Sequence, residues 1–470
     1  MKFNFSKYFF SETTLKKPSV ILLIFTFCFS FWFVDFWRPW NPDEKQNGFV
    51  WDAMHYYSYL PYKFCNNNSF EFGADGNTQY LPIGPNGTHL PKTTYGLSIL
   101  YSPFFALGYK IAYNQKSPLT GFSEPFATCN YWGGVFYVML GLIILRNFLT
   151  KFFNEIVTTI TLIAVFFGTM LFNYTYVINE MSHGYLFFLF TAFISLTYKW
   201  YQEQKIKYTI LLGVVTALIS LIRPTEILIF LFFIFWDIKS LGDIKVKFKF
   251  LFSKYLHFVI MGIIGLAIWM PQFIFWKNQT GSYFYFSYPG ERFFWNDPQI
   301  INILFSYRKG WFTYTPIILL AFLGFFCIKK SFPVSKWFFI SFISFFIYVL
   351  SCWWDWFFGG GFGARGFCQH IAYLSIPMAY LIDFVFFSPK KYSLKPLLIL
   401  TTTVFIILCV CLNIGQTYQS TKNFIHFNAM NEKVYWKNFR QFKKIDEGFY
   451  WTNLTSPDYE KLRSGEDRDQ

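Results

Sequence analysis

Residues 396–415, PLLILTTTVFIILCVCLNIG, form an apolar block that contains no charged side chain. An α-helix rises about 1.5 Å per residue, so a block of this length covers the roughly 30 Å hydrocarbon core of a bilayer. That core holds no water, and a single segment that crosses it satisfies its backbone polar groups by forming a helix. The block therefore predicts a membrane-spanning helix.

The same pattern recurs along most of the chain. Of the 470 residues, 54% are hydrophobic, 25% are aromatic and 14% are charged, whereas an average soluble domain has about 25% charged residues. We therefore predict an all-α integral membrane protein with about eleven transmembrane helices. These spans are expected at 19–38, 129–147, 156–177, 183–199, 208–222, 224–237, 255–276, 311–328, 336–354, 370–388 and 396–415.

The basic residues explain the net charge of +15 without a nucleic-acid partner. They occur as short clusters between apolar blocks, which is typical of cytoplasmic loops under the positive-inside rule. We therefore predict a cytoplasmic N-terminus and no binding of nucleic acid. The clusters begin at Lys2, Arg146, Lys199, Lys239, Lys329 and Lys390.

The order of these clusters predicts the domain organisation. Every second connection is basic only if the apolar stretch 95–113 does not cross the membrane, and Pro103 and Gly108 interrupt that stretch. We therefore expect an amphipathic helix that lies on the membrane surface. The predicted parts are a cytoplasmic segment with the first span at 1–38, an external loop with juxtamembrane helices at 39–128, a transmembrane domain at 129–415 and an external tail at 416–470.

The first external loop carries the best candidate for a catalytic carboxylate. In WDAMHYYSYL, residues 51–60, His55 and Tyr56 follow Asp52 by three and four positions and so share its helix face. A partly desolvated carboxylate beside aromatic rings suits a general base. Alternatively, Asp52 stabilises the start of its helix. Asp43 and Glu44, a few residues earlier, are rival acids.

Three arginines are candidates for binding a phosphate. Arg365 follows the glycines of FFGGGFGAR, and glycine lets a backbone approach an anion closely. The alternative is that the glycines form a tight turn at the membrane and that Arg365 extends to lipid head groups. Arg223, in IRPT, faces the same choice between a ligand and an interfacial anchor. Arg308 adds charge to a further external loop.

Two more residues are weaker candidates for the site. Glu180 lies near the start of a span, where helix capping alone could explain it. His370 could donate a proton or bind phosphate, but a lone histidine near a helix end is more often structural. Asp43, Glu44 and Asp52 supply enough oxygen atoms for a divalent ion. The cofactor therefore stays open, because the sequence is compatible with a metal and does not require one.

Several segments together resemble the GT-C superfamily of membrane glycosyltransferases, which includes the protein mannosyltransferases and the lipid A aminoarabinose transferases. They are the D-x-x-x-Y-Y run that starts at Asp52, TYGLSILYSPFFALG at 94–108, IRPT at 222–225, RKGWFTYTPIILLAFL at 308–323 and WWDWFFGGGFGAR at 353–365. The resemblance extends to about residue 390. One departure is that the acidic pair of residues 43 and 44 lies outside the D-x-x-x-Y-Y run, which leaves open which acid is the base.

The resemblance implies a reaction and a location. The donor would be a sugar linked to polyprenyl phosphate, and an inverting transfer would move the sugar to a glycan, lipid or protein acceptor. Asp52, with Asp43 or Glu44 as rival, would deprotonate the acceptor, while Arg365, Arg223 and Arg308 would bind the donor phosphate. The expected location is a bacterial inner membrane, with the active site facing the periplasm and serving the cell envelope.

Two alternative functions remain open on the sequence alone. The first is a transporter or a flippase for lipid-linked glycans, which usually places ionisable residues near the bilayer midplane and often has repeated halves. Here the charges lie at the ends of spans and no repeat is visible, which favours the transferase. The second is a glycan polymerase or ligase, which would move a whole oligosaccharide.

Overall fold

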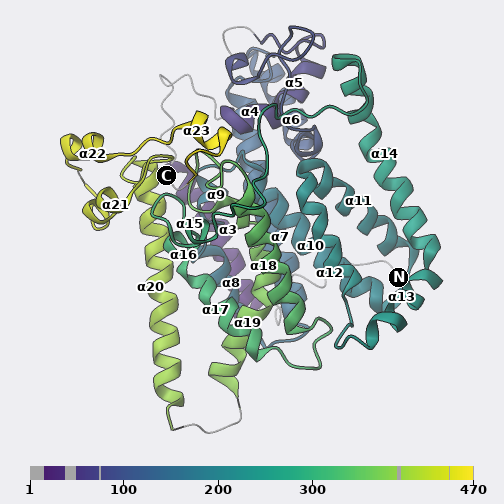
Figure 1. Ribbon diagram of the computed structural model, residues 1–470, viewed down its shortest axis with the longest axis vertical. Helices are drawn as coiled ribbons and strands as arrows, with labels where there is room; N and C mark the ends of the chain where they lie inside the picture. The colour runs from purple at the N-terminus through teal and green to yellow at the C-terminus, as the bar shows by residue number, and fades with distance from the viewer. Residues whose placement is uncertain (1–14, 38–48, 73–75, 389–392, 444, 469–470) are drawn as a thin grey trace. The chain divides into compact units, whose positions relative to one another are not determined.

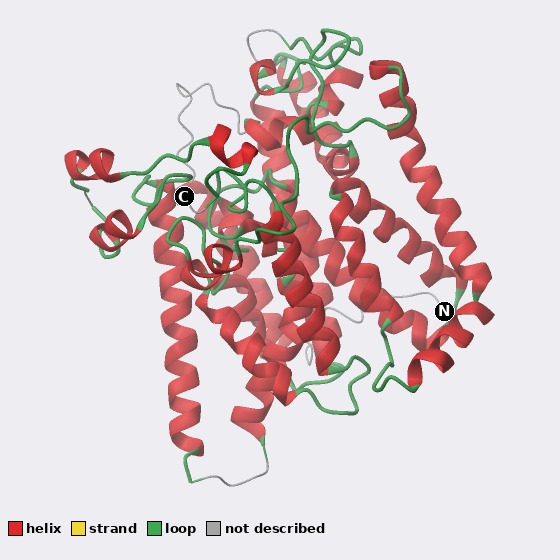
Figure 2. Cartoon of the chain, viewed as in Figure 1, coloured by secondary structure: helices red, strands yellow, loops and turns green. Residues whose placement is uncertain are grey.

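The computed structural model describes residues 15–37, 49–72, 76–388, 393–443 and 445–468, and it is all-helical, with 67% helix. Figures 1 and 2 show helices joined by loops, and no strand occurs within the described ranges. Two isolated antiparallel β-bridges pair Ile83 with His89 and Phe293 with Trp353. The predicted all-α class is therefore confirmed.

The chain divides into two compact units, each built from separate segments. Unit 1 comprises 1–36, 145–178 and 290–470, and unit 2 comprises 37–144 and 179–289. The segments of the two units therefore alternate along the sequence.

Unit 2 is organised around the neighbouring helices α10 (Ser182–Glu203), α11 (Ile206–Ile222) and α14 (Tyr255–Thr280) (Figure 1). The amino end of α6 (Gly96–Gln115) lies against the carboxyl end of α11. A β-carbon at Gly96 would stand 2.8 Å from the backbone nitrogen of Ile222, so only glycine allows this approach. The remaining elements are α4 (Trp51–Tyr57), α5 (Tyr59–Phe64), η1 (Thr78–Tyr80), η2 (Pro224–Ile229), α12 (Phe230–Ile234) and α13 (Asp243–Ser253). Helix α7 (Glu124–Leu149) lies mostly in this unit.

Unit 1 has the buried helix α19 (Ile371–Phe387) at its centre, in contact with α8 (Glu155–Phe167), α17 (Leu319–Gly324) and α20 (Lys395–Thr421). The backbones of α17 and α19 approach closely, since a β-carbon at Gly324 would stand 1.9 Å from the carbonyl oxygen of Pro377. The other helices are α3 (Pro18–Trp37), α9 (Asn173–Tyr176), α15 (Ile300–Phe305), α16 (Trp311–Tyr314), η3 (Pro316–Ile318), η4 (Phe325–Cys327), α18 (Lys336–Cys352), η5 (Arg365–Phe367), α21 (Glu432–Asn438), α22 (Glu447–Asn453) and α23 (Tyr459–Ser464).

Among the described residues, three helices are long and apolar enough to cross a membrane: α7, α14 and α20. The expectation of about eleven spans is not confirmed, because most of the other apolar blocks form helices of 10–17 residues. Local sequence explains several of the shorter helices. Helix α8 ends at Gly168, and Pro224 and Pro316 start new short helices because proline lacks the backbone donor that would continue a helix.

The stretch predicted to lie on the membrane surface is helix α6. It runs as one helix from Gly96 to Gln115 with Pro103 inside it, so neither Pro103 nor Gly108 breaks it. The expected end of the last span at 415 also differs, since α20 continues to Thr421.

Candidate functional site

The predicted DAMHYY run forms helix α4 in unit 2, with Asp52 in its first turn. Asp52 is half-buried, whereas His55 and Tyr56 are buried. The Nδ1 atom of His55 accepts a hydrogen bond from the backbone N–H of Lys92 at 3.1 Å. Burial lowers the pKa of His55 to about 4, against the opposing effect of Asp52 and with a smaller contribution from Lys92. His55 is therefore neutral at physiological pH, and it joins α4 to the segment around Lys92.

Arg223 interacts with Tyr56, Glu226 and Asp52, and we name these four residues the acid cluster. In the sequence, 171 positions separate Arg223 from Asp52 (223 − 52). Burial alone would lower the pKa of Arg223. Tyr56, which shares a side-chain hydrogen bond with it, and the carboxylates of Glu226 and Asp52 outweigh that effect, so the pKa is raised. Two carboxylates and a phenol thus surround one guanidinium. This arrangement favours a role for Arg223 in orienting Asp52 over a role in binding phosphate.

The end of α11 is held in place from two sides. The hydroxyl of Thr94 donates to the carbonyl of Leu221, and the indole N–H of Trp269 donates to the hydroxyl of Ser220 at 3.0 Å. Arg223 caps this helix and Pro224 begins the next one, so the turn carries Arg223 towards α4.

Glu180 lies near this cluster through one intervening side chain, that of Tyr101. The hydroxyl of Tyr101 donates to the backbone carbonyl of Glu180. Tyr101 also interacts electrostatically with Glu180 and with Tyr56. Tyr101 therefore lies between Glu180 and the acid cluster.

An open apolar groove of about 750 Å³ runs along α14 in unit 2. It is lined by Gly262, Gly265, Leu266, Trp269, Phe273, Trp276, Phe284, Tyr285 and Phe286. A β-carbon at Gly262 or Gly265 would meet nothing within 4 Å, so the two glycines widen the groove. One end lies near the acid cluster, because the hydroxyl of Ser287 donates to the carbonyl of Lys92, the residue whose N–H is bonded to His55.

Unit 1 holds a separate group of three cations, which we name the cationic cluster: Arg308, Lys309 and Arg365. Arg308 and Lys309 follow α15 and are 4% and 2% exposed. The ammonium group of Lys309 donates to the carbonyl of Gly361. The pKa of Lys309 is lowered to about 7. Burial is the largest cause, followed by Arg365; Asp355 opposes them, and Arg308 adds a smaller lowering effect.

The glycine-rich loop before Arg365 has the unusual backbone that its sequence suggests. Phe358, Gly359, Gly361 and Gly363 have φ values of +58°, +61°, +148° and +57°, a region that favours glycine. Two backbone donors that the sequence offered to an anion are already used, however. The N–H of Gly361 donates to the carbonyl of Phe427 at 3.3 Å, and that of Phe362 donates to the hydroxyl of Tyr174 at 3.0 Å. The loop therefore supplies its side-chain cation rather than these amides.

The cationic cluster lies with the carboxylate of Asp355 and the phenol of Tyr459. Asp355 acts on both Arg308 and Lys309, and Tyr459 acts on Arg308. Arginine and lysine side chains form charge-assisted hydrogen bonds with phosphate oxygens, so this group of neighbouring cations suits a bound anion such as phosphate.

Sequence reasoning did not include Lys309 among the candidates for binding phosphate, and it did not place His426 beside this cluster. Burial, followed by Lys309 and Arg308, lowers the pKa of His426, which places its ring beside both cations. Lys309 could have been found, because it is adjacent to Arg308 in RKG. His426 is more than one hundred residues away in the sequence, and no local pattern connects it with Arg308.

His370 packs among aromatic rings. It is fully buried, and its ring lies 4.2 Å from that of Phe346 and 5.6 Å from that of Tyr373. These neighbours support the structural alternative for His370.

Asp43 and Glu44 lie outside the described residues. They are two of the three proposed metal ligands and also the alternatives to Asp52 as the base. Within the described ranges, no group of three His, Cys, Asp or Glu side chains is placed to hold a metal ion.

Comparison of this chain with protein-family models, with curated proteins and with solved structures finds no match.

Proposed function

We propose that this chain is an integral membrane glycosyltransferase that uses a sugar linked to polyprenyl phosphate as its donor. The observation that carries the proposal is the cationic cluster, in which Arg308, Lys309 and Arg365 lie with the carboxylate of Asp355. When the bond between a sugar and its phosphate breaks, negative charge grows on the phosphate. Fixed cations that are already desolvated stabilise that charge more strongly than water does.

The reaction would be a single displacement with inversion at the anomeric carbon. The acceptor oxygen or nitrogen attacks that carbon, its proton passes to Asp52, and the electron pair of the broken bond stays on the phosphate oxygen. Arg223, which shares a hydrogen bond with Tyr56 and interacts electrostatically with Asp52, orients the carboxylate for this step. Asp43 and Glu44 remain alternative bases.

Two features support a lipid-linked donor over a soluble one. Helices α7, α14 and α20 are long and apolar enough to cross a membrane. The groove along α14 offers about 750 Å³ of space lined by aromatic and aliphatic side chains to a hydrocarbon chain. The apolar lining of this groove suits a polyprenyl chain. The proposed location is a bacterial inner membrane, with transfer on the periplasmic side to a glycan, lipid or protein.

The test is transfer of labelled sugar from polyprenyl-phosphate donors in membranes that contain the protein. We expect Asp52→Asn and Lys309→Ala to abolish or strongly reduce transfer at unchanged protein levels. Matched controls are Glu71→Gln and Lys330→Ala, whose side chains are exposed. Normal transfer by Asp52→Asn would move the base to Asp43 or Glu44. Absence of transfer by the wild type from every donor would refute the proposal and favour a transporter.

A further inference from the structure

The cationic cluster is enclosed by a later part of the chain. We name residues 424–443 and 445–468 the cover segment; it contains α21, α22 and α23. The guanidinium of Arg308 donates to two carbonyls of this segment, that of Asn428 at 2.8 Å and that of Thr455 at 3.3 Å. The N–H of Gly361 donates to a third carbonyl, that of Phe427. These carbonyls occupy donor positions that a bound phosphate would otherwise use.

Side chains of the cover segment also approach the cluster. Tyr459 of α23 interacts electrostatically with Asp355, Arg308 and Arg365, and its hydroxyl accepts a hydrogen bond from the side chain of Asn428 at 2.7 Å. With the segment in this position, Arg308 and Lys309 are 4% and 2% exposed. A lipid phosphate therefore cannot reach these two cations in this arrangement of the chain.

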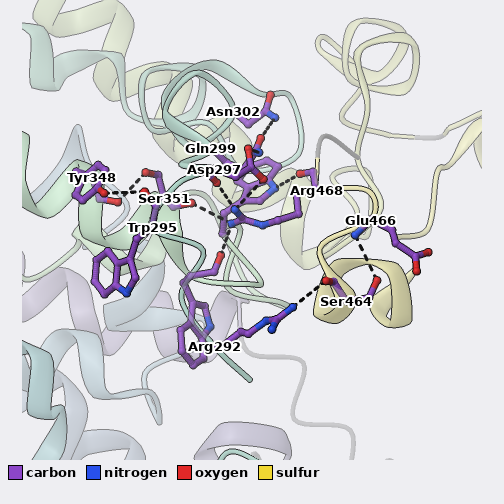
Figure 3. Close-up of polar contacts among 12 residues, drawn as sticks. Arg292, Trp295, Asp297, Gln299, Asn302, Tyr348, Ser351, Ser464, Glu466 and Arg468 are labelled. Carbon is purple, nitrogen blue, oxygen red and sulfur yellow. Dashed lines mark hydrogen bonds and ion pairs between the residues drawn. The ribbon is translucent and has the colours of Figure 1, made fainter. Parts of the chain in front are cut away.

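The far end of the cover segment is held by one buried side chain, Arg468, which is 3% exposed (Figure 3). Its guanidinium donates to the backbone carbonyl and the carboxylate of Asp297, the latter at 3.1 Å. It also donates to the carbonyls of Ser351 at 3.2 Å and Trp353 at 2.8 Å. The indole N–H of Trp356 donates back to the carbonyl of Arg468 at 2.9 Å.

Neighbouring contacts add to this attachment. Arg292 donates to the carbonyl of Ser464 at 2.9 Å, and the ring of Phe294 lies 4.6 Å from each of the guanidinium groups of Arg292 and Arg468. The partners of Arg468 thus come from the loop that precedes α15, from the last turn of α18 and from the loop that follows α18. The loop after α18 also contains Asp355, which acts on Arg308 and Lys309.

We propose that the cover segment closes the anion site and that Arg468 holds it closed, so that an anionic substrate and the closed segment compete for the same arginine donors. This inference rests on the proposed function only in identifying the anion as the donor phosphate. Because closure and anion binding exclude each other, a change that weakens closure strengthens anion binding.

The test uses the full-length protein in detergent and measures how fast an amine-reactive acylating reagent modifies Lys309, read by peptide mass spectrometry. We expect Arg468→Ala to raise the rate about tenfold or more, since it removes several charge-assisted hydrogen bonds. Arg468→Lys should restore part of the protection. Lys461→Ala, an exposed position in α23, is the matched control and should leave the rate unchanged.

A second variant guards against misfolding of the first. Asp297→Asn removes the charged partner of Arg468 from the opposite side and leaves the cover segment intact, and it should raise the rate in the same direction by a smaller factor. Unchanged modification of Lys309 in both Arg468→Ala and Asp297→Asn would overturn the inference.

Inorganic sulfate separates this inference from the proposed function. In Arg468→Ala, sulfate should slow the modification of Lys309 at lower concentrations than in the wild type. If Lys309 becomes reactive but sulfate never protects it, the anion site and with it the phosphate donor are refuted, whereas closure by Arg468 is supported.

Discussion

Lys309→Arg should change the pH dependence of anion binding while it preserves binding at low pH. Burial and Arg365 lower the pKa of Lys309 to about 7, so the side chain is mostly charged below pH 7 and mostly neutral above it. An arginine at this position stays charged at every pH of interest. Across pH 6 to 9 the wild-type cluster therefore loses one of its three positive charges, and the variant loses none.

The expected size follows from the loss of one charged partner. A hydrogen bond to a charged group contributes about 1.5–3 kcal/mol, which corresponds to about 10-fold to 100-fold in affinity. Other groups do not mask the change: burial and the two cations beside it lower the pKa of His426, which is therefore neutral above pH 7, and burial and Asp355 raise the pKa of Tyr459. Wild-type affinity should therefore fall as the pH rises through 7.

The assay is calorimetric titration of the purified protein with sulfate, which keeps a constant charge over this range, whereas inorganic phosphate does not. Lys309→Arg should give an affinity that is nearly flat from pH 6 to pH 9. Parallel pH profiles for the wild type and Lys309→Arg would show that Lys309 does not supply the titrating charge, and the anion site would lose its main support.

Three further predictions concern packing and positioning. Gly324→Ala would place a β-carbon 1.9 Å from a carbonyl oxygen of α19 and should destabilise unit 1 by about 1–3 kcal/mol or more. The measurement is the midpoint of thermal unfolding, which should fall. In the control Gly265→Ala the new β-carbon meets open space, so the midpoint should not change. Gly361→Ala should weaken sulfate binding, because residue 361 has φ +148° and a β-carbon there would stand 2.9 Å from a tyrosine hydroxyl. The control Gly360→Ala needs only a small shift of an aromatic ring. Equal sulfate binding by the two variants would contradict the role of this loop. Arg223→Gln should lower transfer about 10-fold to 100-fold without affecting sulfate binding, and reduced sulfate affinity in that variant would instead make Arg223 an anion ligand.

Local features of the site could be predicted, because they depend on spacing within a few residues. Asp52, His55 and Tyr56 share helix α4 as their spacing requires, and the glycines before Arg365 adopt positive φ values. The neutral state of His55 could not be predicted, since it depends on burial and on a hydrogen bond from Lys92, 37 positions later. The same limit applies to Arg223 beside Asp52, which requires the contact of α6 with α11.

The expectation of about eleven spans is not confirmed, for a different physical reason. A hydropathy window averages over its residues, so it does not register a single residue that ends a helix. The block 311–328 is apolar throughout, yet Pro316 divides it into α16, η3, α17 and η4. The block 156–177 is likewise interrupted at Gly168 and contains α8 and the short helix α9. The contacts of the cover segment with Arg308 could not be predicted, because they join residues more than one hundred positions apart.

The division of the chain into interleaved segments has a consequence for biosynthesis. Unit 2 is complete when residue 289 has been made, but unit 1 needs 290–470 in addition to its two early segments. Residues such as Phe167, whose carbonyl accepts a hydrogen bond from Asn413, therefore wait for partners made 246 residues later. At about 5–20 residues per second, synthesis of that interval takes roughly 10 to 50 seconds. During this time the early helices of unit 1 expose surfaces that membrane lipids or an insertion chaperone must protect. A ribosome stalled before residue 413 should therefore leave a chain in which unit 2 resists protease and unit 1 does not.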